Sequence, residues 1–148
     1  MAMSSIFQAF ASFIPGSRLV DGGDCLQLAK YLFNPTTGLT ALAGGGQSGA
    51  TALNLGINYV STVASDNDSV MLPPAVPGTF VAVCNGGGHS LQVFGQGPNM
   101  GGAAAGDTIA AHNSNTYQAT ATGVAQATTI MALYYCFTAG QWKQFLSA

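Results

Sequence analysis

Short apolar segments separated by turn residues fill the middle of the chain and predict β-strands. Within residues 68–94 the segments SVML, TFVAVC and SLQVF are divided by a proline pair, a Pro-Gly pair and an Asn-Gly-Gly-Gly turn. Proline lacks a backbone donor and marks strand ends, and glycine supplies the positive φ of tight turns. Alternation places Val81 and Val83 on one face of TFVAVC and Phe80 and Cys84 on the other. Because both faces are apolar, we expect this strand to lie between two layers.

The same pattern continues on both sides of this stretch. NYVSTVA precedes it, and a segment at 117–122 and the runs TTIMALYYCF and QWKQFL follow it. About seven or eight short strands, with turn residues every 8–12 positions, are typical of a sandwich or jelly roll. The sequence therefore predicts an all-β domain over residues 57–148, folded as a single jelly-roll-like β-sandwich.

The first 56 residues read as an N-terminal arm with one or two short helices. Phe7, Phe10 and Ile14 follow helical spacing, and a second short helix is expected from Asp24, a plausible N-cap, to Asn34. Large apolar side chains near a terminus must be buried under the domain or in a neighbouring molecule. The residues predicted to make this contact, with a partner or a second copy of the chain, are Ile6, Phe7, Phe10, Phe13 and Ile14.

A glycine-rich stretch, residues 36–56, joins these helices to the predicted domain. It contains three consecutive glycines at 44–46 and a further Gly49. Such a stretch is either a loose connector or an extended arm that becomes ordered along a partner's surface. The sequence leaves both interpretations open.

Charge changes the picture of the surface. Only 5% of the 148 residues are charged and the net charge is −2, against roughly 25% charged residues in an ordinary soluble domain. Without a basic patch, nucleic-acid binding is not expected. A chain with so few charges suits a surface that is largely covered by other subunits, so the composition indicates an assembly component. The alternative is a soluble domain with a neutral polar surface.

Cysteine and hydropathy patterns bear on the compartment. Cys25, Cys84 and Cys136 are far apart and form no CxxC pair, which indicates free thiols and a reducing compartment. The longest apolar span, residues 129–137, is much shorter than the roughly 20 residues of a membrane helix. The N-terminal apolar stretch lacks the basic residues of a secretory signal. We expect neither export by a signal peptide nor a membrane anchor.

Candidate catalytic residues are scarce. His89, Ser90 and Asp107 could be combined into a Ser–His–Asp set, but neighbouring residues of a strand point to opposite faces. Asp66-Asn67-Asp68 lacks the remaining ligands of a calcium loop, and no lysine or helix follows the glycines at 86–88. We predict no enzyme activity, no catalytic residues, no cofactor and no metal. The sequence assigns no ligand to His89, His112 or the loop at 95–106.

Trp142, the single tryptophan, lies on the last predicted strand. Such a residue can stack on a sugar ring, but more often it closes the end of a β-core or an interface. We predict core or interface closure.

An ordered set of short motifs resembles small β-proteins of tailed-phage virions. A Gly/Ala-rich stretch leads into these motifs, and the resemblance covers about two-thirds of the chain, from Leu39 onward. The motifs are Asp68-Ser69-Val70 with Leu72-Pro73, Val81 to Asn85, Ser90-Leu91 with Val93-Phe94, Asp107 to Ile109, and Gly140 to Trp142.

The resemblance implies a capsid decoration, or cement, protein. Such a protein binds the outer surface of the capsid as a small oligomer and holds neighbouring major-capsid-protein subunits together. Its expected partners are the major capsid protein and itself, with a homotrimer favoured and a dimer possible. It would be made in the host cytoplasm and end on the virion surface. The alternatives are a head-fibre or tail-associated module that binds a receptor or glycan, and a monomeric β-domain without an assembly role.

Overall fold

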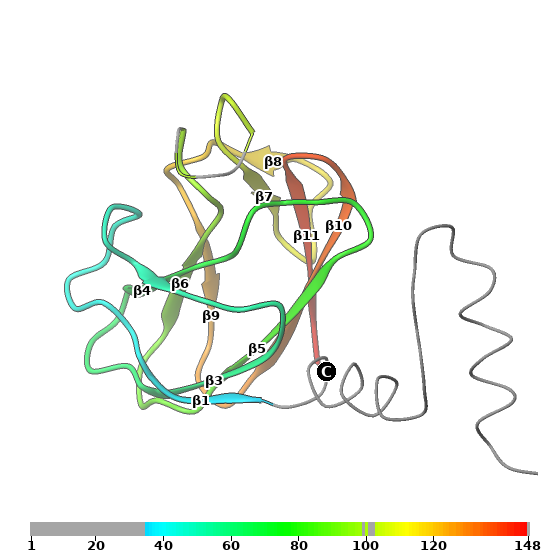
Figure 1. The fold of residues 1–148 in the computed structure, drawn as a ribbon. Helices are drawn as coiled ribbons and strands as arrows, with labels where there is room; N and C mark the ends of the chain where they lie inside the picture. The colour runs from blue at the N-terminus through cyan, green and yellow to red at the C-terminus, as the bar shows by residue number, and fades with distance from the viewer. Residues whose placement is uncertain (1–34, 99, 101–102, 148) are drawn as a thin grey trace, which may run out of the picture. The chain divides into compact units, whose positions relative to one another are not determined.

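The described part of the protein is all-β. The computed structural model describes residues 35–98, 100 and 103–147 (Figure 1). The alternating apolar segments that predicted strands do form strands here, and turns that contain glycine separate them. The strands are β1 (Thr36–Thr40), β2 (Thr51–Ala52), β3 (Gly56–Thr62), β4 (Asp68–Met71), β5 (Phe80–Asn85), β6 (Leu91–Phe94), β7 (Thr108–Ala110), β8 (Tyr117–Gln118), β9 (Val124–Gln126), β10 (Met131–Thr138) and β11 (Gln141–Leu146).

Two mixed sheets form the domain. The seven-stranded sheet has the order β1-β3-β5-β10-β11-β7-β8, and the four-stranded sheet has the order β2-β4-β6-β9 (Figure 1). From β1 to β6 the chain alternates between the sheets, and each of the strands β1 to β4 pairs with the strand two places further along. Two layers around one core are consistent with a β-sandwich.

This alternation makes several ladders parallel. Parallel ladders join β1 with β3 and β3 with β5 in the large sheet, and β2 with β4 and β4 with β6 in the small one. β7 and β11 also run parallel. A jelly roll, which the sequence predicted, is built from antiparallel strands. Here each crossover passes through the opposite sheet, so the chain returns to its first sheet in the same direction.

One hydrophobic core lies between the sheets. The inward-facing residues of β5 and β10 alternate with outward-facing ones, so that Val81, Val83 and Tyr134 are fully buried. Trp142 on β11 is also fully buried and is among the largest core side chains. The small sheet contributes Val70, Leu91, Val93 and Val124 to the same cluster.

The domain begins further upstream than the boundary at residue 57 that the sequence analysis expected. Residues 36–56 contain β1 and β2, one in each sheet. Gly45 has a φ of 72°, and a Cβ at this position would lie 2.6 Å from the carbonyl oxygen of Asn67. The glycine run therefore allows close backbone packing in a position that side chains would obstruct. The two predicted helices and the five apolar residues at 6–14 lie outside the described residues.

Candidate functional site

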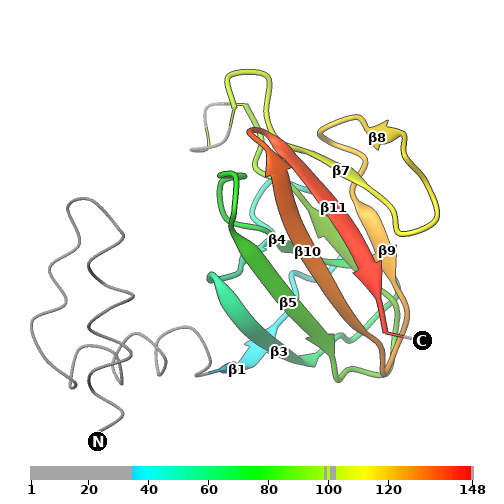
Figure 2. The same ribbon diagram turned by 90° about the vertical axis from the view of Figure 1, so that its right-hand side faces the viewer.

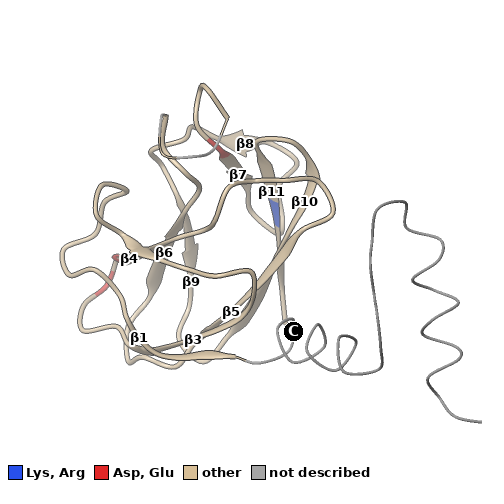
Figure 3. Cartoon of the chain, viewed as in Figure 1, with Lys and Arg blue, Asp and Glu red and all other residues tan. Residues whose placement is uncertain are grey.

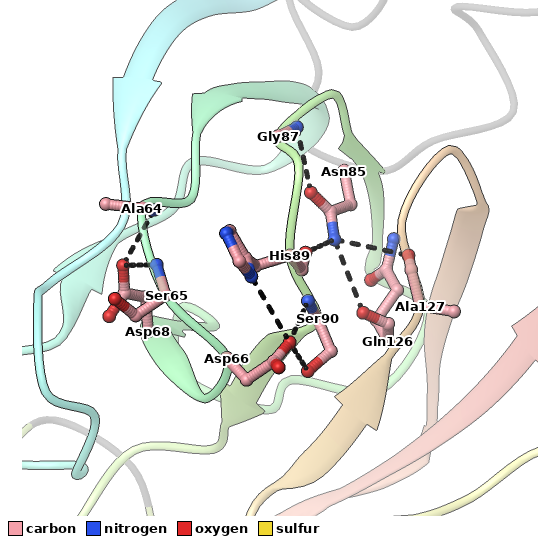
Figure 4. Close-up of polar contacts among 10 residues, drawn as sticks. All are labelled: Ala64, Ser65, Asp66, Asp68, Asn85, Gly87, His89, Ser90, Gln126 and Ala127. Atoms are coloured by element: carbon pink, nitrogen blue, oxygen red, sulfur yellow. Dashed lines mark hydrogen bonds and ion pairs between the residues drawn. The ribbon is translucent and has the colours of Figure 1, made fainter.

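Polar side chains gather at one end of the sandwich, where the turns after β3 and β5 meet (Figure 4). The carboxylate of buried Asp68 accepts hydrogen bonds from the backbone N–H groups of Gly44 (3.0 Å), Ala64 (2.9 Å) and Ser65 (3.0 Å). These bonds, above all the one from Ser65, lower the pKa of Asp68 below its ordinary value of 3.8. Asp68 thus ties the glycine-rich segment to the turn after β3.

Asp68 should make stability depend on acidity. Because its pKa is lower in the folded chain than in the unfolded chain, its contribution is present above the ordinary value and is lost as the pH falls through the folded value. We expect Asp68→Asn to flatten the decrease in urea midpoint between about pH 5 and pH 2. Urea unfolding at several pH values, followed by circular dichroism, measures this. If the pH slope did not change, the ionised carboxylate of Asp68 would not be stabilising the fold as a hydrogen-bond acceptor.

Asp66 organises the neighbouring turn. Its Oδ1 accepts hydrogen bonds from the backbone N–H (2.9 Å) and the hydroxyl (2.8 Å) of Ser90, and these bonds lower the pKa of Asp66. The Nδ1 atom of His89 lies 3.8 Å from the same oxygen (Figure 4). The Ser90 hydroxyl therefore donates to a carboxylate, and His89 approaches that carboxylate. This arrangement joins the turn after β3 to the turn after β5.

Asn85 fastens the glycine turn to β9. Its Nδ2 donates to the carbonyl oxygens of His89 (2.9 Å), Gln126 (3.3 Å) and Ala127 (3.2 Å), and its Oδ1 accepts from the N–H of Gly87 (3.1 Å) (Figure 4). A Cβ on Gly87 would lie 2.5 Å from the Cβ of Val63, so glycine is required for this close approach. The amide is fully engaged within the protein, so its role is structural.

In the described part of the chain, Asp107 makes no hydrogen bond to these turns and binds other segments. It is fully buried, and its oxygens accept hydrogen bonds from the backbone N–H groups of Ala75 (2.8 Å) and Ala103 (2.9 Å). His112 is exposed, and its backbone N–H donates to Gln144. Within the ranges that the structure describes, no group of three or more His, Cys, Asp or Glu residues is placed to hold a metal ion.

The most prominent exposed feature is apolar and lies on the outer side of the seven-stranded sheet. In Figure 2, β3, β5, β10 and β11 lie side by side toward the viewer, and no described segment passes in front of them. We define the outer apolar face by seven residues on these strands: Tyr59, Phe80, Met131, Leu133, Tyr135, Phe137 and Phe145.

The register of the strands makes this face continuous. Leu133 is paired with Ala82 on one side and with Phe145 on the other, and Tyr135 is paired with Phe80. The rings of Tyr135 and Phe137 are 4.5 Å apart between centroids, and those of Phe137 and Phe145 are 6.4 Å apart. Tyr59, Met131, Leu133, Phe137 and Phe145 are between 38% and 62% exposed. Contiguous apolar surface of this kind marks an interaction site.

Charge is nearly absent from this face. Among the described residues the charged side chains are Lys143, Asp66, Asp68 and Asp107 (Figure 3). Only Lys143 lies on β10 or β11, and its Nζ donates to the carbonyl oxygens of Ala111 (2.9 Å) and Ser114. The ammonium group is therefore held beside the β7 edge of the sheet.

Sequence reasoning identified the apolar character of these strands but not their exposure. The alternation in β5 indicated two apolar faces, and we expected layers on both sides. The structure places Val81 and Val83 in the core, while Phe80 and Cys84 lie on a side that the described residues leave open. The signal was present in the run MALYYCF, which is apolar at every position.

No protein-family model, curated protein or solved structure matches this chain. Across the part of the chain that the structure describes, no helix has the length and apolar character needed to cross a membrane.

Proposed function

We propose that this protein is a structural component of a tailed-phage virion. It binds the outer surface of the capsid as a small oligomer and cements neighbouring major-capsid-protein subunits. The observation that carries the proposal is the outer apolar face, a broad and almost uncharged sheet surface that the described residues leave open. A protein with such a surface gains stability when subunits cover it, and many modest contacts repeated over a shell give strong binding.

The motifs on which the family resemblance rests also support this proposal. Asp68-Ser69-Val70 forms most of β4, Val81 to Asn85 forms most of β5, and Asp107 leads into β7. Their polar members hold turns: Asp68, Asn85 and Asp107 all bond to backbone groups. The motifs thus describe a scaffold, as expected for a small structural protein. A jelly-roll-like sandwich remains part of the proposal, with the parallel ladders as its departure from the antiparallel form.

The glycan-binding alternative finds less support. Trp142, the ring on which a sugar would stack, is fully buried between the sheets. No other observation favours a head-fibre or tail module.

The proposal predicts stoichiometric binding to capsids. Purified full-length protein, mixed with expanded capsids lacking it, should pellet with them at a copy number in the hundreds, because a cement protein occupies repeated lattice positions. A variant lacking residues 1–16 should bind much more weakly, since the predicted apolar anchors Phe7, Phe10 and Phe13 are removed. Quantitative gel analysis of the pellets measures both.

Two results would contradict the proposal. Protein that stays in the supernatant at saturating concentration would rule out capsid binding. A dozen or fewer copies per particle would assign the protein to a tail or vertex structure. Undiminished binding of the shortened variant would leave cementing intact but would show that the N-terminal residues are not the anchor.

A further inference from the structure

β10 has the side-chain pattern of a strand that is covered on both sides. Its sequence MALYYCFT alternates between a fully buried set, Ala132, Tyr134 and Cys136, and an outward set that is also large and apolar. Sheets with one solvated face normally carry polar residues on that face, and apolar residues on both faces are typical of strands between two layers. The described residues supply one of these layers, the four-stranded sheet.

We propose that the second layer is the outer apolar face of another copy of this chain, packed face to face about a two-fold axis. The inference rests on the proposed function for the premise that this face is an assembly surface, and it names the partner. In such an isologous contact each copy presents the same patch. Two sheets stacked in this way lie about 10 Å apart with their strands nearly aligned, as in the interior of a sandwich.

The charge distribution permits this pairing. In a two-fold contact the same face of the partner lies against each group. Like charges on the face would therefore be brought together and would repel each other. The outer apolar face contains no acidic residue, and its neighbouring charged residue is Lys143, which is paired with Tyr135 and whose ammonium group donates to the carbonyls of Ala111 and Ser114 after β7. A contact centred on β5 and β10 therefore brings no acidic group into the interface and leaves the Lys143 ammonium hydrogen-bonded on the β7 side of the sheet.

The available area fits a dimer of modest affinity. A large side chain has roughly 150–250 Å² of surface. At their exposed fractions, the five exposed members of the face together present roughly 400–500 Å² of solvent-accessible surface on each copy. With half-buried Phe80 and Tyr135 included, two copies would bury roughly 1,000–1,200 Å², the lower limit for specific interfaces. We therefore expect a dissociation constant on the order of micromolar.

The chemistry of the face favours a second copy over a different protein. Interfaces between different proteins that also exist separately are about as polar as ordinary surface, whereas homodimer interfaces are more apolar. The side chains of the seven residues offer two tyrosine hydroxyls, and their other heavy atoms are all carbon or sulfur. Such a surface contains little that would select one foreign partner over another.

Sedimentation equilibrium of the full-length chain, from about 1 to 200 µM, tests the proposal because this range brackets a micromolar constant. The wild type should convert from monomer to dimer. Leu133→Glu places a carboxylate at the centre of the face and should weaken dimerisation at least ~100-fold, since both copies then bury like charges. Phe137→Lys, at the most exposed position of the face, should have the same effect.

Ala125→Glu is the matched control, because Ala125 is exposed on β9 of the other sheet and should leave dimerisation unchanged. Far-ultraviolet circular dichroism confirms that each variant folds. A wild type that stays monomeric, a trimer, or a dimer that survives both Leu133→Glu and Phe137→Lys would overturn the proposal. Capsid pelleting is measured separately, so a monomer that still binds capsids would refute this interface and leave the proposed function standing.

Discussion

Trp142→Ala is expected to lower the free energy of unfolding by about 3–5 kcal/mol, the range for truncating a large buried aromatic side chain. Trp142 has no exposed surface and packs in the core between the two sheets. Its replacement leaves a cavity that the paired strands β10 and β11 cannot close without breaking their ladder. Equilibrium unfolding in urea, measured at one protein concentration for all variants, gives the value.

Trp142→Phe is the matched comparison. The indole N–H of Trp142 is buried and has no hydrogen-bond partner among the described residues, and such a group costs about 1–3 kcal/mol. Phenylalanine removes this donor and leaves a smaller cavity than alanine, so we expect a loss of less than about 1.5 kcal/mol. If Trp142→Ala unfolded at nearly the same urea concentration as the wild type, the ring would not be closing the core.

Asp107→Ala is expected to cost about 3 kcal/mol, because hydrogen bonds to a charged acceptor contribute about 1.5–3 kcal/mol each. The fully buried carboxylate accepts from the N–H groups of Ala75 and Ala103, which join the turn after β4 to the segment before β7. Alanine leaves the buried N–H of Ala75 without an acceptor and also removes the acceptor of the N–H of Ala103, which lies on an exposed segment. Urea unfolding again provides the measurement.

Asp107→Asn tests the interpretation of that loss. The asparagine side chain is nearly isosteric and keeps one acceptor oxygen, so it should retain one of the two bonds and lose roughly half as much stability as alanine. Equal losses for the two variants would indicate that shape rather than hydrogen bonding matters at this position. A negligible loss for both would show that the two backbone donors find other acceptors.

Much of the fold followed from local pattern. The segments that became β4, β5, β6, β10 and β11 were recognised because each combines apolar alternation with a proline or glycine boundary. The strand expected at 117–122 is limited to Tyr117–Gln118 in β8, and β9 at Val124–Gln126 follows after a turn at Gly123, whose φ is 62°. β1, β2, β7 and β9 were missed because strands of two to five residues show little periodicity.

For the polar residues too, local pattern identified the residues but not all of their hydrogen-bond partners. Asp68, Asn85 and Asp107 stood out as members of ordered motifs, but each of them also bonds to a partner far along the chain. Asp68 bonds to Gly44, and Asn85 bonds to Gln126 and Ala127. The residue type shows that a side chain can accept or donate hydrogen bonds in a turn. Which turn it binds depends on which segments lie next to each other in the folded protein.

Local sequence pattern was enough to predict that residues 57–148 are all-β, that few residues are charged, and that the central strands are apolar on both faces. These are local properties, because side-chain alternation and turn residues act over a few positions. The three-dimensional arrangement was needed to show that residues 36–56 enter both sheets, that β1, β3 and β5 run parallel, and that the described residues leave the outer apolar face open. Direction, pairing and exposure arise from contacts between distant segments, and alternation within one strand does not encode the strand beside it.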